Sequence, residues 1–132
     1  MNEDKNNPFQ ILGTDKVPTE GAQEVVEQNK VEDINERIKN LINSSDLFLF
    51  MKGNADMPQC GFSANVVTIL NHLQKKYNTF DVLSDWDVRE GVKVYSNWPT
   101  FPQLYFKGKL VGGNDIITEM FETGDLEKVL NS

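Results

Sequence analysis

The chain has 132 residues, of which 20 are acidic and 13 are basic, so its formal net charge is −7. This length supports one domain with its own hydrophobic core, and no apolar run approaches the roughly 18 residues of a membrane span. The excess of acidic residues argues against nonspecific binding to nucleic acid or to an anionic membrane. Because Cys60 is the only cysteine, no disulfide can form within these residues, and a single free thiol suits a reducing intracellular compartment.

Residues 1–30 are rich in Asn, Glu, Gln, Pro and Gly and show no helical or strand periodicity. We expect these residues to form a disordered or loosely attached tail, and residues 31–132 to form one domain. The alternative for part of the tail is that Phe9–Leu12 is a docking segment. The tail lacks the apolar stretch of a signal peptide and the arginine-rich character of a mitochondrial presequence. The expected location is therefore the cytoplasm, with a mitochondrion or plastid open if a presequence is missing from this sequence.

The domain begins with a helix and a strand. Val31–Asn43 carries its apolar residues on one face, which predicts an amphipathic helix. Leu47–Met51 is an uninterrupted apolar run, rich in aromatics and too short for a globular helix, so it predicts a buried strand. From Val66 onward apolar residues recur at helical spacing, which predicts a helix that begins at or just after Cys60 and runs to about Tyr77.

The rest of the chain predicts further short elements. In order, these are a strand at Phe80–Leu83, a helix at Asp87–Tyr95, a hairpin of strands at Gln103–Phe106 and Lys109–Val111, a helix capped by Asn114 and Asp115, and a last turn at Leu126–Leu130. This order mixes crossover helices with one hairpin. It predicts an α/β fold with a small mixed sheet and helices on both faces.

Cys60 lies where a thiol becomes reactive. The free amide groups and the dipole of a helix N-terminus favour the thiolate over the thiol, and Lys52 can add a positive charge. The alternative is a buried cysteine that acts as a small hydrophobic residue. The flanking sequence PQCGFS is polar or small, so it favours a reactive thiol over a core residue.

Four sequence strings identify a family. They are MKG at 51–53, CGFS at 60–63, WPTFPQL at 98–104 and LVGGNDI at 110–116. In this order and spacing they resemble the monothiol (CGFS-type) glutaredoxins of single-domain organisation, and the resemblance runs from about Val31 to Leu130. It implies a thioredoxin fold with a four-stranded sheet, glutathione as a ligand, and Cys60 as the reactive thiolate.

The resemblance also implies the residues that bind the two carboxylates of glutathione. Lys52 and Arg89 would pair with the glycine carboxylate. The backbone amides of Asn114 and Asp115 would bind the other carboxylate, and the Asp115 side chain would accept the neighbouring ammonium. The alternatives are surface charges for Lys52 and Arg89, and a plain helix cap for Asp115.

Two further positions follow from the resemblance. The peptide bond between Phe101 and Pro102 would be cis, which would expose the Phe101 backbone for strand-like pairing with the cysteine of glutathione. Many similar proteins have a cysteine where this chain has Asn114. The chain therefore has no second thiol to resolve a mixed disulfide on Cys60.

Three functions remain open from the sequence. The first function is an iron–sulfur cluster carrier. A [2Fe–2S] cluster takes four thiolates, and two chains supply them if each contributes Cys60 and one bound glutathione. Such a carrier would be a glutathione-bridged homodimer when it holds the cluster and a monomer when apo. It would transfer the cluster to iron–sulfur acceptor proteins. The second is a weak glutathione-dependent thiol–disulfide oxidoreductase with Cys60 as the catalytic nucleophile. The third is a binding adaptor in which Cys60 is incidental.

Overall fold

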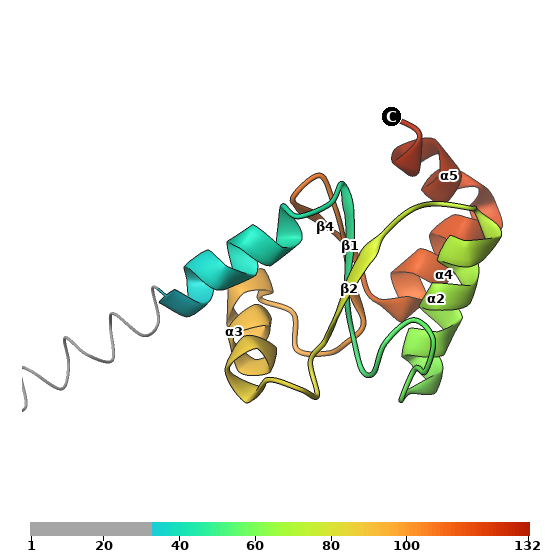
Figure 1. Ribbon diagram of the computed structural model, residues 1–132. Helices are drawn as coiled ribbons and strands as arrows, with labels where there is room; N and C mark the ends of the chain where they lie inside the picture. Colours follow the sequence, from blue (N-terminus) through green and yellow to red (C-terminus); the bar gives the residue numbers. More distant parts are fainter. Residues whose placement is uncertain (1–32) are drawn as a thin grey trace, which may run out of the picture. The chain divides into compact units, whose positions relative to one another are not determined.

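The computed structural model describes residues 33–132, and Ile34–Ser132 forms one compact unit. The tail expected over residues 1–30 lies outside the described residues. The strands are β1 (Leu47–Met51), β2 (Asn78–Asp81), β3 (Gln103–Phe106) and β4 (Lys109–Gly112). The helices are residues 33–42, α2 (Gly61–His72), α3 (Trp86–Ser96), α4 (Asn114–Thr123) and α5 (Asp125–Leu130) (Figure 1). Within this part of the chain, none of the helices has the length and hydropathy to cross a lipid bilayer.

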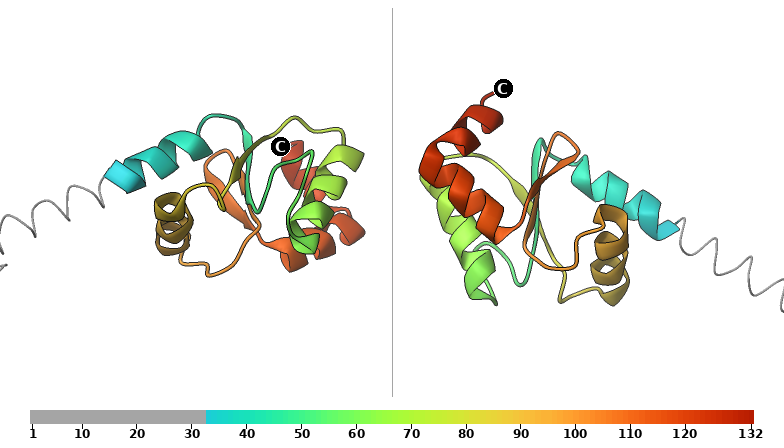
Figure 2. Two further views of the ribbon diagram at one scale, coloured as in Figure 1. Left: turned by 60° about the horizontal axis from the view of Figure 1, so that its bottom comes forward. Right: turned by 180° about the vertical axis from the view of Figure 1, so that it is seen from behind.

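The four strands form one mixed sheet in the order β2-β1-β3-β4. Strand β1 runs parallel to β2 and antiparallel to β3, and β3 and β4 form an antiparallel hairpin. Helices α2, α4 and α5 cover one face of the sheet, and α3 and the helix at residues 33–42 cover the other (Figure 2). The expected α/β architecture, with a four-stranded mixed sheet and helices on both faces, is confirmed.

Strand β1 lies at the centre of two hydrophobic cores. Leu47, Leu49 and Met51 pack in the core beneath α2, α4 and α5. Phe48 and Phe50 pack in the second core with residues of α3 and of the helix at residues 33–42. Each such side chain contributes about 1.5–3 kcal/mol on burial. Because both faces of β1 are buried, its sequence is an uninterrupted apolar run rather than an alternating one.

Two predicted elements have different bounds in the structure. Helix α2 ends at His72 instead of about Tyr77, because Gln74 has a positive φ of 58° and turns the chain. Leu73 and Tyr77 still pack against the same core, so the apolar spacing continues past the end of the helix. Strand β2 spans Asn78–Asp81 rather than Phe80–Leu83, since Asn78–Asp81 pair in register with Phe48–Met51.

Capping explains two smaller differences. Helix α3 begins at Trp86, one residue before the predicted start, because the Asp85 carboxylate accepts a hydrogen bond from the Val88 N–H at 3.1 Å. The expectation that Asn114 and Asp115 cap α4 is wrong. The cap residue is Gly113, with no side-chain bond, and Asn114 and Asp115 are the first two residues of the helix.

Candidate functional site

Cys60 is the residue that precedes α2, and its thiol is free and partly buried. The first hydrogen bond of the helix joins the Ala64 N–H to the Cys60 carbonyl at 2.9 Å, so the amides of residues 61–63 have no partner within the helix. The backbone N–H of Ser63 contributes most to a lowered pKa of Cys60. Partial burial opposes this shift, and the Phe62 N–H and the charge of Lys52 add to it. The thiol is therefore biased toward the thiolate, as the sequence predicts.

Lys52 is fixed beside Cys60 by its backbone. Its N–H donates to the buried hydroxyl of Ser63 at 3.1 Å, and its carbonyl accepts from the Gln59 N–H at 2.8 Å. The next residue, Gly53, has a φ of 85°, and a Cβ there would lie 2.5 Å from the Met57 carbonyl oxygen. Only glycine fits this turn. The turn therefore returns the chain to Cys60 directly after β1.

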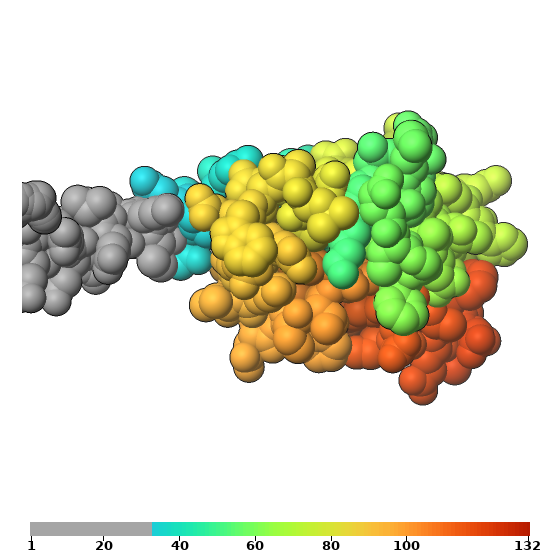
Figure 3. Space-filling model, turned by 90° about the horizontal axis from the view of Figure 1, so that it is seen from below, coloured from blue at the N-terminus to red at the C-terminus, as the bar shows by residue number. Residues whose placement is uncertain are grey.

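Cys60 opens into a cavity of about 250 Å³ that is lined by three cationic side chains. The lining residues are Lys52, Cys60, Phe62, Arg89, Lys93, Pro99, Thr100 and Phe101. Figure 3 shows the face of the molecule on which the chain around α2, α3 and the loop before β3 meet. The structure thus brings the predicted residues Lys52, Arg89 and Phe101 together with Cys60.

Lys93 is a lining residue that the sequence reasoning missed. It lies four residues after Arg89 on α3, and this spacing places both side chains on one face of the helix. The Lys93 Nζ donates to the Glu90 carboxylate at 3.1 Å, and the Arg89 Nε lies 3.9 Å from the same oxygen atom. The two cations therefore share one carboxylate of their own helix.

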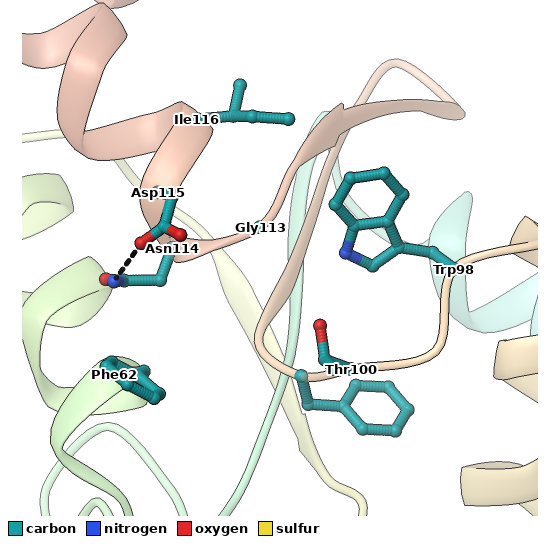
Figure 4. A pocket seen from close by; sticks show the side chains of 8 residues that line it. Phe62, Trp98, Thr100, Gly113, Asn114, Asp115 and Ile116 are labelled. Atoms are coloured by element: carbon teal, nitrogen blue, oxygen red, sulfur yellow. Dashed lines mark hydrogen bonds between the residues drawn. The ribbon is translucent and has the colours of Figure 1, made fainter.

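A second cavity of about 460 Å³ adjoins the first (Figure 4). Its lining residues are Phe62, Trp98, Thr100, Phe101, Gly113, Asn114, Asp115 and Ile116. The first hydrogen bond of α4 joins the Ile117 N–H to the Gly113 carbonyl, so the preceding amides have no partner within the helix. Free amides at a helix N-terminus attract anions. Phe62, Thr100 and Phe101 line both cavities, so one elongated ligand can occupy the two together.

The predicted residues Phe101 and Pro102 are both buried in the loop before β3. The peptide bond between them is cis, as the family resemblance implies. Phe101 lines both cavities, whereas Pro102 lines neither of them. Trp98 also lines the larger cavity. The other site residues predicted from the sequence therefore divide between two adjoining cavities.

The donor set limits what metal chemistry the chain can support. Across residues 33–132, no group of three or more His, Cys, Asp or Glu side chains comes together to hold a metal ion. Cys60 supplies one thiolate, and a [2Fe–2S] cluster takes four. The chain thus fits such a cluster only with thiolates from outside itself, and the cavity beside Cys60 has room for a ligand that carries one.

Curated relatives match most of this chain. A monothiol glutaredoxin of Synechocystis, ycf64-like and uncharacterized, is 51% identical over 71% of the chain and 88% of the relative. Glutaredoxin 3 of Danio rerio is 47% identical over 92% of the chain but 36% of the relative. Monothiol glutaredoxin-S17 of Arabidopsis thaliana is 54% identical over 74% of the chain and 20% of the relative. The chain therefore spans only about a fifth to a third of the length of the two longer relatives.

Family and fold comparisons agree with these matches. The glutaredoxin family model matches residues 47–111. The solution structure of reduced poplar apo GrxS14 superimposes with a TM-score of 0.67 at 41% identity, and it covers 74% of this chain and 90% of that one. The sheet and its flanking helices therefore form the thioredoxin/glutaredoxin fold that the sequence predicts. The chain belongs to the glutaredoxin family, among the monothiol glutaredoxins.

Proposed function

We propose that the chain binds glutathione beside Cys60 and carries a [2Fe–2S] cluster as a glutathione-bridged homodimer, which transfers the cluster to iron–sulfur acceptor proteins. The observation that carries the proposal is the cavity in which the Cys60 thiol lies next to Lys52, Arg89 and Lys93. Membership of the monothiol glutaredoxins supports a glutathione-linked role. We also propose a reducing intracellular compartment, because the function requires a free thiol.

Glutathione has a carboxylate at each end, and the two cavities offer a cationic site and a helix N-terminus. In the proposed complex, Lys52, Arg89 and Lys93 pair with the glycine carboxylate. The amides at the start of α4 bind the other carboxylate, and Asp115 accepts the ammonium beside it. Phe101, which lines both cavities, pairs through its backbone with the central cysteine.

The cluster is cargo in this proposal. Cys60 and the glutathione thiolate of each chain are its ligands, so two chains complete the four thiolates. Glutathione is not covalently attached to the protein, so half of the ligands can dissociate when an acceptor binds. The partly exposed position of Cys60 gives the thiolates of an acceptor access to the same place. The chain is a monomer when no cluster bridges it to a second copy.

The lowered pKa of Cys60 favours a second candidate, a glutathione-dependent oxidoreductase. The Cys60 thiolate would attack the glutathione sulfur of a protein mixed disulfide, and the protein thiolate would leave and take up a proton. A free glutathione thiolate would then attack the Cys60–glutathione disulfide, which releases glutathione disulfide and restores the Cys60 thiolate. We expect slow turnover. Rapid, saturable turnover of a small mixed-disulfide substrate would favour this enzyme over the carrier.

Anaerobic reconstitution tests the carrier directly. The chain mixed with iron, sulfide and glutathione should give a coloured dimer on gel filtration, and the mixture without glutathione should stay colourless. Cys60→Ser should not develop colour, whereas Lys76→Gln, which removes an exposed cation outside the two cavities, should behave like the unmodified chain. Persistent colour in Cys60→Ser would refute the assignment of Cys60 as a ligand.

A further inference from the structure

We propose that Asn65, acting through Asn114, positions the Asp115 carboxylate to accept the ammonium group of glutathione. The inference rests on the proposed function, because it takes glutathione as the ligand. The Asn65 Nδ2 on α2 donates to the Asn114 Oδ1 on α4 at 2.8 Å. The Asn114 Nδ2 then donates to the Asp115 Oδ1 at 3.3 Å (Figure 4). Two hydrogen-bonded side-chain amides, those of Asn65 and Asn114, therefore connect α2 to Asp115.

Thr118 fixes the donor and acceptor ends of these two hydrogen bonds. The Thr118 hydroxyl donates to the Asn114 carbonyl at 2.8 Å, so its oxygen is left as an acceptor for Asn65. The Asn65 Nδ2 donates to this hydroxyl at 2.9 Å and to Asn114 with its other hydrogen. Both hydrogens of the Asn65 amide are then used. Asn114 must present its oxygen to Asn65, and consequently its NH₂ group to Asp115.

The orientation matters because Asp115 is exposed and carries no other side-chain hydrogen bond among residues 33–132. An exposed carboxylate samples several rotamers, and fixing one before the ligand binds lowers the entropic cost of binding. The Asn114 amide holds Oδ1 and leaves Oδ2 free to accept from an ammonium. A reversed Asn114 amide would instead place its oxygen against the carboxylate and repel it. Asn65 therefore acts as a positioning residue for Asp115 rather than as a ligand-binding residue itself.

A pair of ligands separates this role from a general structural one. Glutathione carries the ammonium, and its deaminated analogue, glutaryl-cysteinyl-glycine, lacks it. Titration calorimetry on the full chain should show that Asn65→Ala weakens glutathione binding about three- to tenfold, the size of one ordinary hydrogen bond, and leaves binding of the analogue unchanged. Asn65→Asp should weaken glutathione binding further, because a carboxylate cannot donate and would turn the Asn114 amide around.

Asn71 on the same helix gives matched controls. Its side chain is exposed and accepts from the Tyr77 hydroxyl at 2.9 Å, away from both cavities. Asn71→Ala and Asn71→Asp repeat the same changes in side chain and charge, and both should leave the preference for glutathione intact. Equal losses for glutathione and the analogue in Asn65→Ala, or no loss, would overturn the inference. An unmodified chain that binds neither ligand would overturn the proposed function, and this inference with it.

Discussion

Removing the hydroxyl of Ser63 tests how the fold lowers the pKa of the Cys60 thiol. Ser63 is fully buried, and its Oγ accepts the Lys52 N–H at 3.1 Å. In Ser63→Ala that donor lies against a methyl group and stays unsatisfied, which should lower the free energy of unfolding by about 1–3 kcal/mol. For a unit of this size each kcal/mol lowers Tm by roughly 4–8 °C.

The same hydroxyl also bears on the thiol. It is one of the groups that lower the pKa of Cys60, although the backbone N–H of Ser63 contributes more and remains in Ser63→Ala. The pKa of Cys60 should therefore rise in the variant while staying below that of a free thiol. Thiolate absorbance in the ultraviolet during a pH titration measures this pKa, and urea unfolding measures the stability.

The two effects are linked through pH. Because folding lowers the pKa of Cys60, the unfolded chain binds more protons. The thiolate thus stabilises the fold above the ordinary thiol pKa, and this contribution is lost as pH falls through the lowered pKa. In Ser63→Ala this contribution should be smaller. Ser96→Ala, whose hydroxyl bonds to the Val92 carbonyl, should leave the Cys60 pKa unchanged. An unchanged Cys60 pKa and unchanged stability in Ser63→Ala would refute the reasoning.

Two further substitutions on α3 test the site and the packing behind it. Glu90→Gln should tighten glutathione binding about two- to fivefold in calorimetry, because its carboxylate no longer competes with the ligand for Lys93 and Arg89. Glu119→Gln, exposed on α4, is the matched control, and unchanged or weaker binding in Glu90→Gln would contradict the expectation. Gly91→Ala should lower the urea midpoint by the equivalent of about 1–3 kcal/mol, since its methyl group would lie 2.5 Å from the Ile34 Cγ2. A midpoint that is equal or higher would show that the helix at residues 33–42 moves aside at little cost.

The sequence pattern predicted the bounds of an element correctly where the residues of that one segment alone determine its structure. Strand β1 was predicted to the residue, because an apolar run between Asp46 and Lys52 has one plausible structure. The end of α2 was not, because Leu73 and Tyr77 return to the same core from outside the helix and continue its spacing. Periodicity records which residues are buried, and it does not record the backbone angle at Gln74 that ends the helix.

The site shows the same division between local and tertiary information. Cys60 and Lys52 could be placed from the sequence, since both adjoin a strand or a helix start. The roles of the other site residues came from the resemblance to a family. Lys93 and Asn65 had no sequence signal that separates them from ordinary surface residues on a helix. Asn65 becomes part of a network only because α2 lies against α4, which brings it within 2.8 Å of Asn114.

The central strand also governs how the domain loses its structure. Since alternate side chains of β1 belong to the two cores, neither helical layer can detach without removing packing that the other layer needs. We therefore expect this unit to melt in one all-or-none transition, with the loop that leads from β1 to Cys60 anchored for as long as the whole unit is folded. Heat or denaturant should abolish thiol reactivity and global structure in the same transition, leaving no partly unfolded species with a working cysteine.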